Sequence, residues 1–172
     1  AKHSLADGQY GSRRADCEES ARILGVDQLV DVIDLDEASA ALGDERLAAR
    51  TRHVVSEIAR TRAFIELLDE GPLEGTRLAV AGALLNDSHD SLRDDYEVSC
   101  EELDVAVEAA RAAGAHGARM TGGGFGGSAI ALLDAHAVEA VARAVAAAYA
   151  ERGWESPHFI RSLPGAPAGR LD

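Results

Sequence analysis

A glycine-rich run at residues 119–128 is the part of the sequence whose residue types and spacing are most typical of a functional site. It reads Arg-Met-Thr-Gly-Gly-Gly-Phe-Gly-Gly-Ser, with glycine at five of the six positions from 122 to 127. Glycine adopts left-handed backbone conformations at little steric cost and leaves the peptide groups bare, so a ligand or a second chain can approach the backbone. A tight irregular turn is the alternative interpretation, because fewer glycines would suffice for it.

Two known glycine motifs can be compared with this run, and both fail on context. A dinucleotide-binding fingerprint needs a helix after its glycines, whereas residues 128–133 form a short apolar run that is typical of a strand. A phosphate-binding P-loop needs lysine followed by serine or threonine, and the only lysine of the chain is Lys2. We therefore predict that the run joins the two strands of a hairpin.

Composition favours a globular domain that binds a small molecule or a protein. The 172 residues are 47% hydrophobic and 27% charged, which is enough for one domain with a real core. The net charge of −13 argues against nucleic acid or an anionic membrane as a partner, because both bind a concentrated basic surface. Cys17 and Cys100 are too few for a disulfide framework, which favours a reducing compartment.

Targeting signals are not recognisable in the sequence. No stretch approaches the ~20 apolar residues of a membrane span, and the first residues do not resemble a signal peptide. We therefore expect a soluble, cytoplasmic protein. The chain begins Ala-Lys-His rather than with methionine, so we also expect it to be a fragment of a longer sequence.

Helical periodicity dominates the first two thirds of the chain. Helices are predicted near residues 10–25, 47–68 and 74–92, the second of them ending before a Gly-Pro pair. The apolar run at residues 29–35 is predicted to be a strand or an irregular connection. Ser99 and Glu102 have the spacing of a capping box, which predicts that a further helix begins there and ends at Gly114.

The last third of the chain favours alternating strands and helices. Strands are predicted at residues 118–120 and 128–133, on either side of the glycine run. A helix capped by Asp134 and closed by Gly153 follows, and residues 158–163 are predicted to form a last strand. This order predicts an α+β fold in which several helices pack on a small, largely antiparallel sheet.

Three other features have residue types that occur in functional sites. A Ser-His-Asp run at residues 88–90 has the residue types of a catalytic triad, but consecutive residues do not face one another. A group of metal-type ligands lies at His89, Asp90, Asp94 and Asp95. Acidic residues are ordinary at a helix end, so we predict no metal site there. Tyr10 could present its phenol to a ligand or simply cap a helix.

Four stretches of the sequence together resemble the C-terminal half of a galactokinase. They are residues 3–18, with His-Ser-Leu, Tyr10, Arg13-Arg14 and Cys17-Glu18; residues 53–57, with His-Val-Val and Glu57; residues 91–99, Ser-Leu-Arg-Asp-Asp-Tyr-Glu-Val-Ser; and residues 119–127. The stretches follow the order of the family over nearly the whole chain. The last two strings are highly specific in combination, although a glycine run alone is weak evidence.

The resemblance implies a fold and an activity. Galactokinases are GHMP small-molecule kinases, so residues 1–172 are expected to form a GHMP-kinase C-terminal domain, with ferredoxin-like βαβ elements packed with helices. The implied activity is phosphorylation of the anomeric hydroxyl of α-D-galactose by ATP, with Mg²⁺.

The resemblance also implies site residues. Tyr10 matches the tyrosine whose hydroxyl contacts the sugar, and Lys2 lies where relatives carry a basic residue near the site. The implied active-site loop, which lies beside the nucleotide-binding half, comprises Gly122, Gly123, Gly124, Phe125, Gly126 and Gly127.

The family's remaining machinery is expected to precede this chain. The resemblance places the galactose-recognition motif, the phosphate loop, the Mg²⁺ ligands and the catalytic Asp and Arg in an N-terminal domain. No catalytic residue and no metal ligand is therefore expected among residues 1–172, and the isolated chain is expected to be inactive. Its expected partners are galactose, ATP and that N-terminal domain. Two alternatives remain open, a non-catalytic sugar-sensing module and a kinase for N-acetylgalactosamine.

Overall fold

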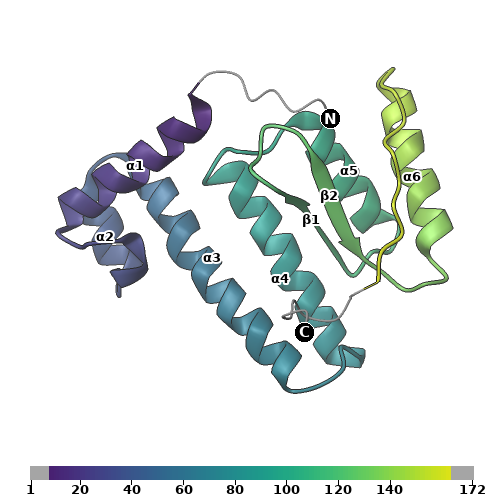
Figure 1. Cartoon of the computed structure of the whole chain (residues 1–172), viewed down its shortest axis with the longest axis horizontal. Helices are drawn as coiled ribbons and strands as arrows, with labels where there is room; N and C mark the ends of the chain where they lie inside the picture. Colours follow the sequence, from purple (N-terminus) through teal and green to yellow (C-terminus); the bar gives the residue numbers. More distant parts are fainter. Residues whose placement is uncertain (1–7, 164–172) are drawn as a thin grey trace, which may run out of the picture.

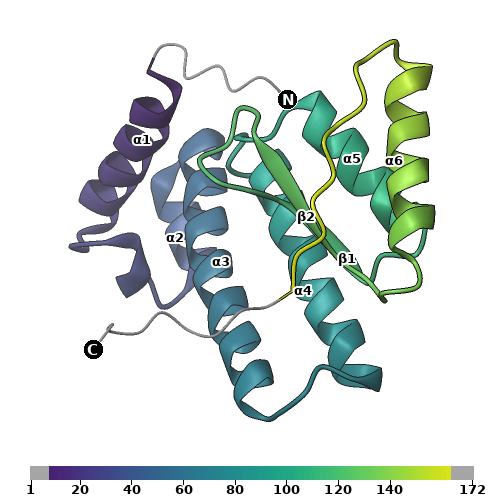
Figure 2. The same ribbon diagram turned by 45° about the vertical axis from the view of Figure 1, so that its right-hand side comes forward.

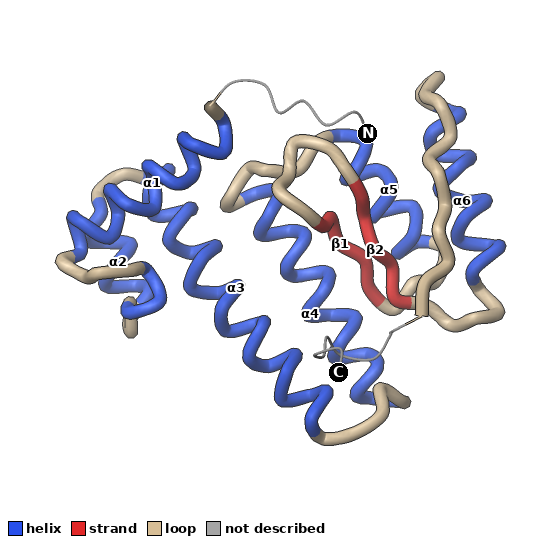
Figure 3. Tube along the Cα trace, viewed as in Figure 1, coloured by secondary structure: helices blue, strands red, loops and turns tan. Residues whose placement is uncertain are grey.

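A computed structural model describes residues 8–163 of the chain (Figure 1). Figure 3 shows one small hairpin among helices. The elements, in chain order, are α1 (Gln9–Leu24), the short 3-10 helix η1 (Leu29–Asp31), α2 (Leu35–Leu42), α3 (Glu45–Asp69), α4 (Gly75–Asp94), α5 (Glu101–Ala112), β1 (Gly117–Thr121), β2 (Ser128–Leu132) and α6 (Val138–Glu151). None of the described helices is both long and apolar enough to cross a membrane.

Helices α3 and α4 lie between two packed groups of elements. On one side, α1 and α2 pack against the first half of α3, around a small core of Leu42, Leu47 and Ala48. On the other side, α4 lies along the hairpin, which α5 also covers, and α6 packs on α5 (Figures 1 and 2). The long helices thus connect the N-terminal helices to the sheet.

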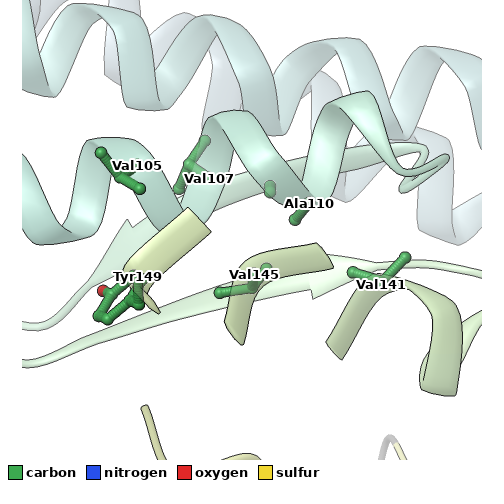
Figure 4. Close-up of a cluster of buried hydrophobic side chains, with 7 residues drawn as sticks. Val105, Val107, Ala110, Val141, Val145 and Tyr149 are labelled. Atoms are coloured by element: carbon green, nitrogen blue, oxygen red, sulfur yellow. The ribbon is translucent and has the colours of Figure 1, made fainter. Parts of the chain in front are cut away.

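The second group has an apolar core built from helix stripes and one strand. Figure 4 shows α5 and α6 facing each other through Val105, Val107, Ala110, Val141, Val145 and Tyr149. Val141, Val145 and Tyr149 recur every four residues, and Val107 and Ala110 are three apart, which is the spacing of one helix face. Burying a valine such as Val107, which is fully inaccessible, contributes on the order of 1.5–3 kcal/mol to stability.

The hairpin is antiparallel and lies very close to α4. Met120 of β1 pairs with Ala129 of β2, and Ala118 pairs with Ala131. Gly117 and Gly82 meet where the strand crosses α4, and a Cβ placed on Gly117 would lie 2.2 Å from the carbonyl oxygen of Gly82. Neither position can therefore carry a side chain without moving the helix from the strand.

Several predicted elements are confirmed, and one of the two alternatives for residues 29–35 is excluded. Helix α1 ends at Gly25, whose φ of 68° is the left-handed conformation common after a helix. Residues 29–35 are not a strand; they form η1, an irregular connection at residues 32–34 and the first residue of α2. Asp34 caps α2 by accepting a hydrogen bond from the backbone N–H of Glu37 at 2.9 Å.

Three further predictions of local structure are wrong. Helix α5 has Cys100 rather than Ser99 as its N-cap, because the Ser99 hydroxyl instead donates to Asp104 Oδ1 at 2.5 Å. Helix α6 starts after Ala137, and no side chain caps its N-terminus, so Asp134 is not the cap. Residues 158–163 form no strand, since the described sheet has two strands and Ile160 stays 80% exposed.

Candidate functional site

The glycine loop at residues 122–127 connects β1 to β2 through an unusual run of left-handed residues. The φ angles are positive at Gly122 (94°), Gly124 (88°), Gly126 (125°) and Gly127 (96°), and also at Phe125 (59°). A two-residue hairpin turn needs positive φ at one or two positions. The loop is therefore a more elaborate structure than a turn, and only Gly123 has a backbone conformation that any residue adopts.

One part of the loop is fastened to the segment that precedes α5. The backbone N–H of Phe125 donates to the carbonyl oxygen of Val98 at 2.6 Å. A Cβ on Gly124 would lie 2.5 Å from that same oxygen, so only glycine allows the contact. A Cβ on Gly123, in contrast, would meet nothing within 4 Å. The loop thus has one anchored residue and one bare residue side by side.

Segment 95–98 is a shared support for the loop and for α1. Arg13 of α1 donates to the carbonyl oxygens of Tyr96 (2.6 Å) and Glu97 (3.0 Å), and its guanidinium carbon lies 6.0 Å from the centre of the Phe125 ring. Arg50, only 2% exposed, binds the Glu97 carboxylate at 2.5 Å. Glu97 itself has a φ of 52°, a conformation that costs on the order of 1–3 kcal/mol for a residue with a side chain. The hydrogen bonds hold this strained segment in place.

The proposed sugar-contacting residue lies at the open end of α1. Tyr10 is in the first turn, 71% exposed, one turn before Arg13. Figures 1 and 2 both show this end of α1 and the glycine loop at the same edge of the molecule. Tyr10 is thus exposed to solvent on the helix from which Arg13 reaches segment 95–98 and the Phe125 ring. Lys2 lies outside the described residues.

The contacts that hold the glycine loop and segment 95–98 were not evident from the sequence. Arg13, Arg50 and Val98 lie far from residues 122–127 along the chain, and no local pattern assigns them to the loop. Arg13 and Val98 fall inside stretches that resemble galactokinases, which is the only signal that could have singled them out.

The Ser-His-Asp run and its acidic neighbours are used structurally. Ser88 donates to Glu57 Oε1 at 2.6 Å, the Nδ1 atom of His89 lies 3.1 Å from the backbone nitrogen of Met120, and Asp90 binds Arg111 at 2.9 Å. The three side chains thus have separate partners and form no triad. Within residues 8–163, no three His, Cys, Asp or Glu side chains are grouped so as to hold a metal ion.

Glu57 connects α3 to the strand that leads into the loop. Its carboxylate accepts from Arg60 of the same helix (2.8 Å), from Ser88 of α4 (2.6 Å) and from Arg119 of β1 (3.0 Å). Burial alone would raise the pKa of this carboxyl group, but the hydrogen bonds from Ser88 and Arg60 and the charge of Arg119 lower it overall. Glu57 is therefore ionised at neutral pH and holds Arg119 in position.

His53 is a buried neutral base beneath segment 95–98. Its ring stacks on Tyr96 with 4.4 Å between ring centres, and its Nδ1 lies 3.0 Å from Ser91 Oγ. The Ser91 hydroxyl donates its single hydrogen bond to Asp95 Oδ2 at 2.9 Å. It can therefore only accept from the His53 ring, so Nδ1 of His53 carries the proton and donates. Burial is the main reason why the pKa of His53 falls to about 4.

Acidification from pH 6.5 to 4.5 is expected to destabilise the protein through His53. The unfolded chain binds the proton with a pKa near 6.5 and the folded chain only near 4, so the stability contributed by neutral His53 is lost as the pH falls between these values. The loss is roughly 2–3 kcal/mol over this range. Urea unfolding at several pH values measures this loss.

Two histidine variants serve as the test and the control. His53→Phe keeps a ring against Tyr96 and should flatten the pH dependence of the free energy of unfolding, whereas a change at an exposed histidine, His136→Phe, should leave it unchanged. Parallel curves for wild type and His53→Phe would contradict the assignment.

Comparison with known proteins places this arrangement in a family. The family model described as GHMP kinases C terminal matches residues 63–151, just over half of the chain. The chain therefore belongs to the GHMP kinases, as the C-terminal type of domain. Its α+β fold class is confirmed, with a sheet of two antiparallel strands in the described part of the chain.

Galactokinases are among its similar relatives. The chain is 50% identical to a galactokinase of Streptomyces coelicolor over 173 aligned positions, covering 99% of this chain and 43% of that protein. It is 50% identical to a Homo sapiens galactokinase over 139 positions, covering 79% and 34%. A crystal structure of Lactococcus lactis galactokinase complexed with galactose matches with a TM-score of 0.81 at 38% identity, covering 89% of this chain and 40% of that one. The chain thus spans less than half the length of these relatives, and the resemblance seen in the sequence is confirmed.

Proposed function

We propose that residues 1–172 are the C-terminal domain of a galactokinase, which transfers the terminal phosphoryl group of ATP to the anomeric hydroxyl of α-D-galactose. The observation that carries the proposal is the left-handed glycine loop, which lies at the same edge of the molecule as the N-terminal end of α1 (Figures 1 and 2), the helix end that carries the exposed Tyr10. The similarity to galactokinases over 99% of the chain supports it. The intact kinase would act in the cytoplasm, with this domain docked on its own N-terminal domain.

In this proposal the domain positions both substrates. The phenol of Tyr10 hydrogen-bonds a galactose hydroxyl, and the loop from Gly122 to Gly127, with Phe125, lies against the nucleotide side of the site. Phosphoryl transfer depends chiefly on positioning and on charge stabilisation, so a rigid loop contributes by alignment. The oxygen of the sugar hydroxyl forms a bond to the terminal phosphorus, the bond from that phosphorus to the oxygen bridging it to ADP breaks, and ADP leaves. The hydroxyl proton passes to the catalytic Asp that the proposal places in the N-terminal domain.

Metal ligands are not assigned to this domain. The glycine loop offers backbone groups, which fit contact with a nucleotide or with the domain that binds it. The described residues 8–163 offer no carboxylate cluster for Mg²⁺. The resemblance to galactokinases supports the proposal that the Mg²⁺ that accompanies ATP, like the catalytic Asp and Arg, is held by the N-terminal domain.

Replacing Tyr10 with phenylalanine tests the sugar contact in the intact kinase. The change keeps the ring and removes one hydrogen bond, so kcat/KM for galactose should fall about two- to tenfold while the KM for ATP barely moves. Tyr149→Phe is the matched control, because its hydroxyl donates to the carbonyl oxygen of Glu102 at 2.6 Å and its ring is buried in the core of the α5–α6 pair. This control should lower the melting temperature and leave the galactose kinetics unchanged.

The wild-type measurements decide between the functions. Coupled ADP release with galactose and with N-acetylgalactosamine should show higher kcat/KM for galactose. Preference for the acetylated sugar would make the protein an N-acetylgalactosamine kinase, and sugar binding without turnover would make it a sensing module. Unchanged galactose kinetics in Tyr10→Phe would remove Tyr10 from the site.

A further inference from the structure

Two side chains of α4 satisfy the backbone of β1 along the edge that faces this helix. Asn86 Oδ1 accepts from the N–H of Ala118 at 2.9 Å, and His89 Nδ1 accepts from the N–H of Met120 at 3.1 Å. Asn86 and His89 are three residues apart on the helix, so they share a face. Helix α4 lies along β1 in both Figure 1 and Figure 2. The two side chains stand where a neighbouring strand would otherwise supply acceptors.

His89 is the acceptor nearer to the glycine loop. Its side chain is fully buried, and Met120 precedes Gly122 by two residues. The Met120 side chain is buried in the same cluster as Val98 and Phe125. The hydrogen bond from the Phe125 N–H to the Val98 carbonyl oxygen is the other anchor of the loop. The entry of the loop is thus fixed by His89 and its middle by Val98.

The hydrogen bond fixes the tautomer of His89. A backbone N–H can only donate, so Nδ1 must be unprotonated and the neutral ring must carry its proton on Nε2. Nε2 lies 3.2 Å from Asp104 Oδ1, which accepts a hydrogen bond from Ser99 Oγ at 2.5 Å, while Nε2 itself is buried without a hydrogen-bond partner among the described residues. Burial is the main cause that lowers the pKa of His89, and the ring therefore stays neutral near pH 7.

We propose that His89 is a positioning residue for the proposed kinase reaction, and that it acts by accepting the Met120 N–H and so fixing where the glycine loop leaves β1. The expected effect on turnover rests on the proposed function, whereas the positioning of the loop by His89 does not. The bond also explains why a fully buried histidine occupies α4, because an apolar residue there would leave the Met120 N–H without an acceptor.

Two polar variants of the intact kinase separate the two nitrogen atoms of the ring. His89→Asn keeps an oxygen near the position of Nδ1 and loses the contact with Asp104. His89→Gln reaches toward the position of Nε2 and loses the acceptor for Met120. We expect His89→Asn to keep kcat within about threefold of wild type, and His89→Gln to lower kcat about tenfold with the KM for galactose unchanged. Hydrogen exchange of residues 118–126 should be faster in His89→Gln alone.

A matched control uses the other His–Asp pair beside β1. His116 Nε2 lies 3.3 Å from Asp134 Oδ2 just before the strand, at the end remote from the loop. His116→Gln should change neither kcat nor the exchange of residues 118–126. An equal kcat in His89→Asn and His89→Gln, or a higher kcat in His89→Gln, would overturn the proposal.

A measurement without any variant covers the case in which both fold poorly. Long-range ¹H–¹⁵N spectra of the wild-type protein should show His89 with Nδ1 unprotonated and hydrogen-bonded, and a protonated Nδ1 would overturn the proposal. If the wild-type protein does not phosphorylate galactose, the proposed function alone is rejected. The ring spectra and the exchange comparison then still decide whether His89 fixes the loop.

Discussion

Alanine at position 124 is expected to lower the free energy of unfolding by roughly 2–4 kcal/mol and the turnover of the intact kinase about a hundredfold. The left-handed φ of 88° disfavours any side chain at this position. The added Cβ would also lie 2.5 Å from the Val98 carbonyl oxygen, which cannot move without breaking its bond with the Phe125 N–H. The loop would then lose its anchor to segment 95–98. Melting temperature and steady-state kinetics measure the two effects.

Gly123→Ala is the matched control for stability and a probe of function. Its Cβ meets nothing within 4 Å in this chain, so the free energy of unfolding should stay within about 0.5 kcal/mol of wild type. If the bare backbone faces the nucleotide or the N-terminal domain, turnover should nevertheless fall. A Gly124→Ala protein that melts like wild type would contradict the Val98 contact. A Gly123→Ala enzyme with normal turnover would show that the bare backbone at Gly123 takes no part in the reaction.

Much of the secondary structure was predictable because its signals are local. The apolar stripe of α3 and the glycine after α1 follow from helix geometry alone, and the five glycines identified the loop. Helix α2 was missed because eight residues are too few for a clear periodicity. The Ser99 capping box failed because Asp104, in the first turn of α5, accepts the hydrogen bond of the Ser99 hydroxyl.

The support of the site was not predictable, because its contacts join residues far apart in the sequence. Arg13 binds Tyr96 and Glu97 across more than eighty positions, and His89 accepts from Met120 across thirty-one. A single sequence contains no pattern that pairs such residues. The residue types could suggest a site at the loop, but only the folded backbone shows that Gly124 is anchored and Gly123 is bare.

Gly82→Ala is expected to destabilise the protein by more than about 3 kcal/mol, although alanine is the better helix former. A Cβ at this position of α4 would lie 2.0 Å from the carbonyl oxygen of His116 and 2.4 Å from its carbonyl carbon. Both are backbone atoms of the residue just before β1, so the helix and the strand must separate. Their separation would also draw Asn86 and His89 away from the strand amides that they satisfy.

Gly11→Ala makes the same chemical change where nothing opposes it. Gly11 lies inside α1, and its added Cβ would meet nothing within 4 Å. Helix propensity should then act alone and stabilise the protein by about 0.5–1 kcal/mol. Urea unfolding of both variants measures the two free energies against wild type. Opposite signs are expected because only Gly82 faces another backbone. A Gly82→Ala protein within about 1 kcal/mol of wild type would mean that α4 and β1 can separate cheaply, and that their close approach does not hold the hairpin in place.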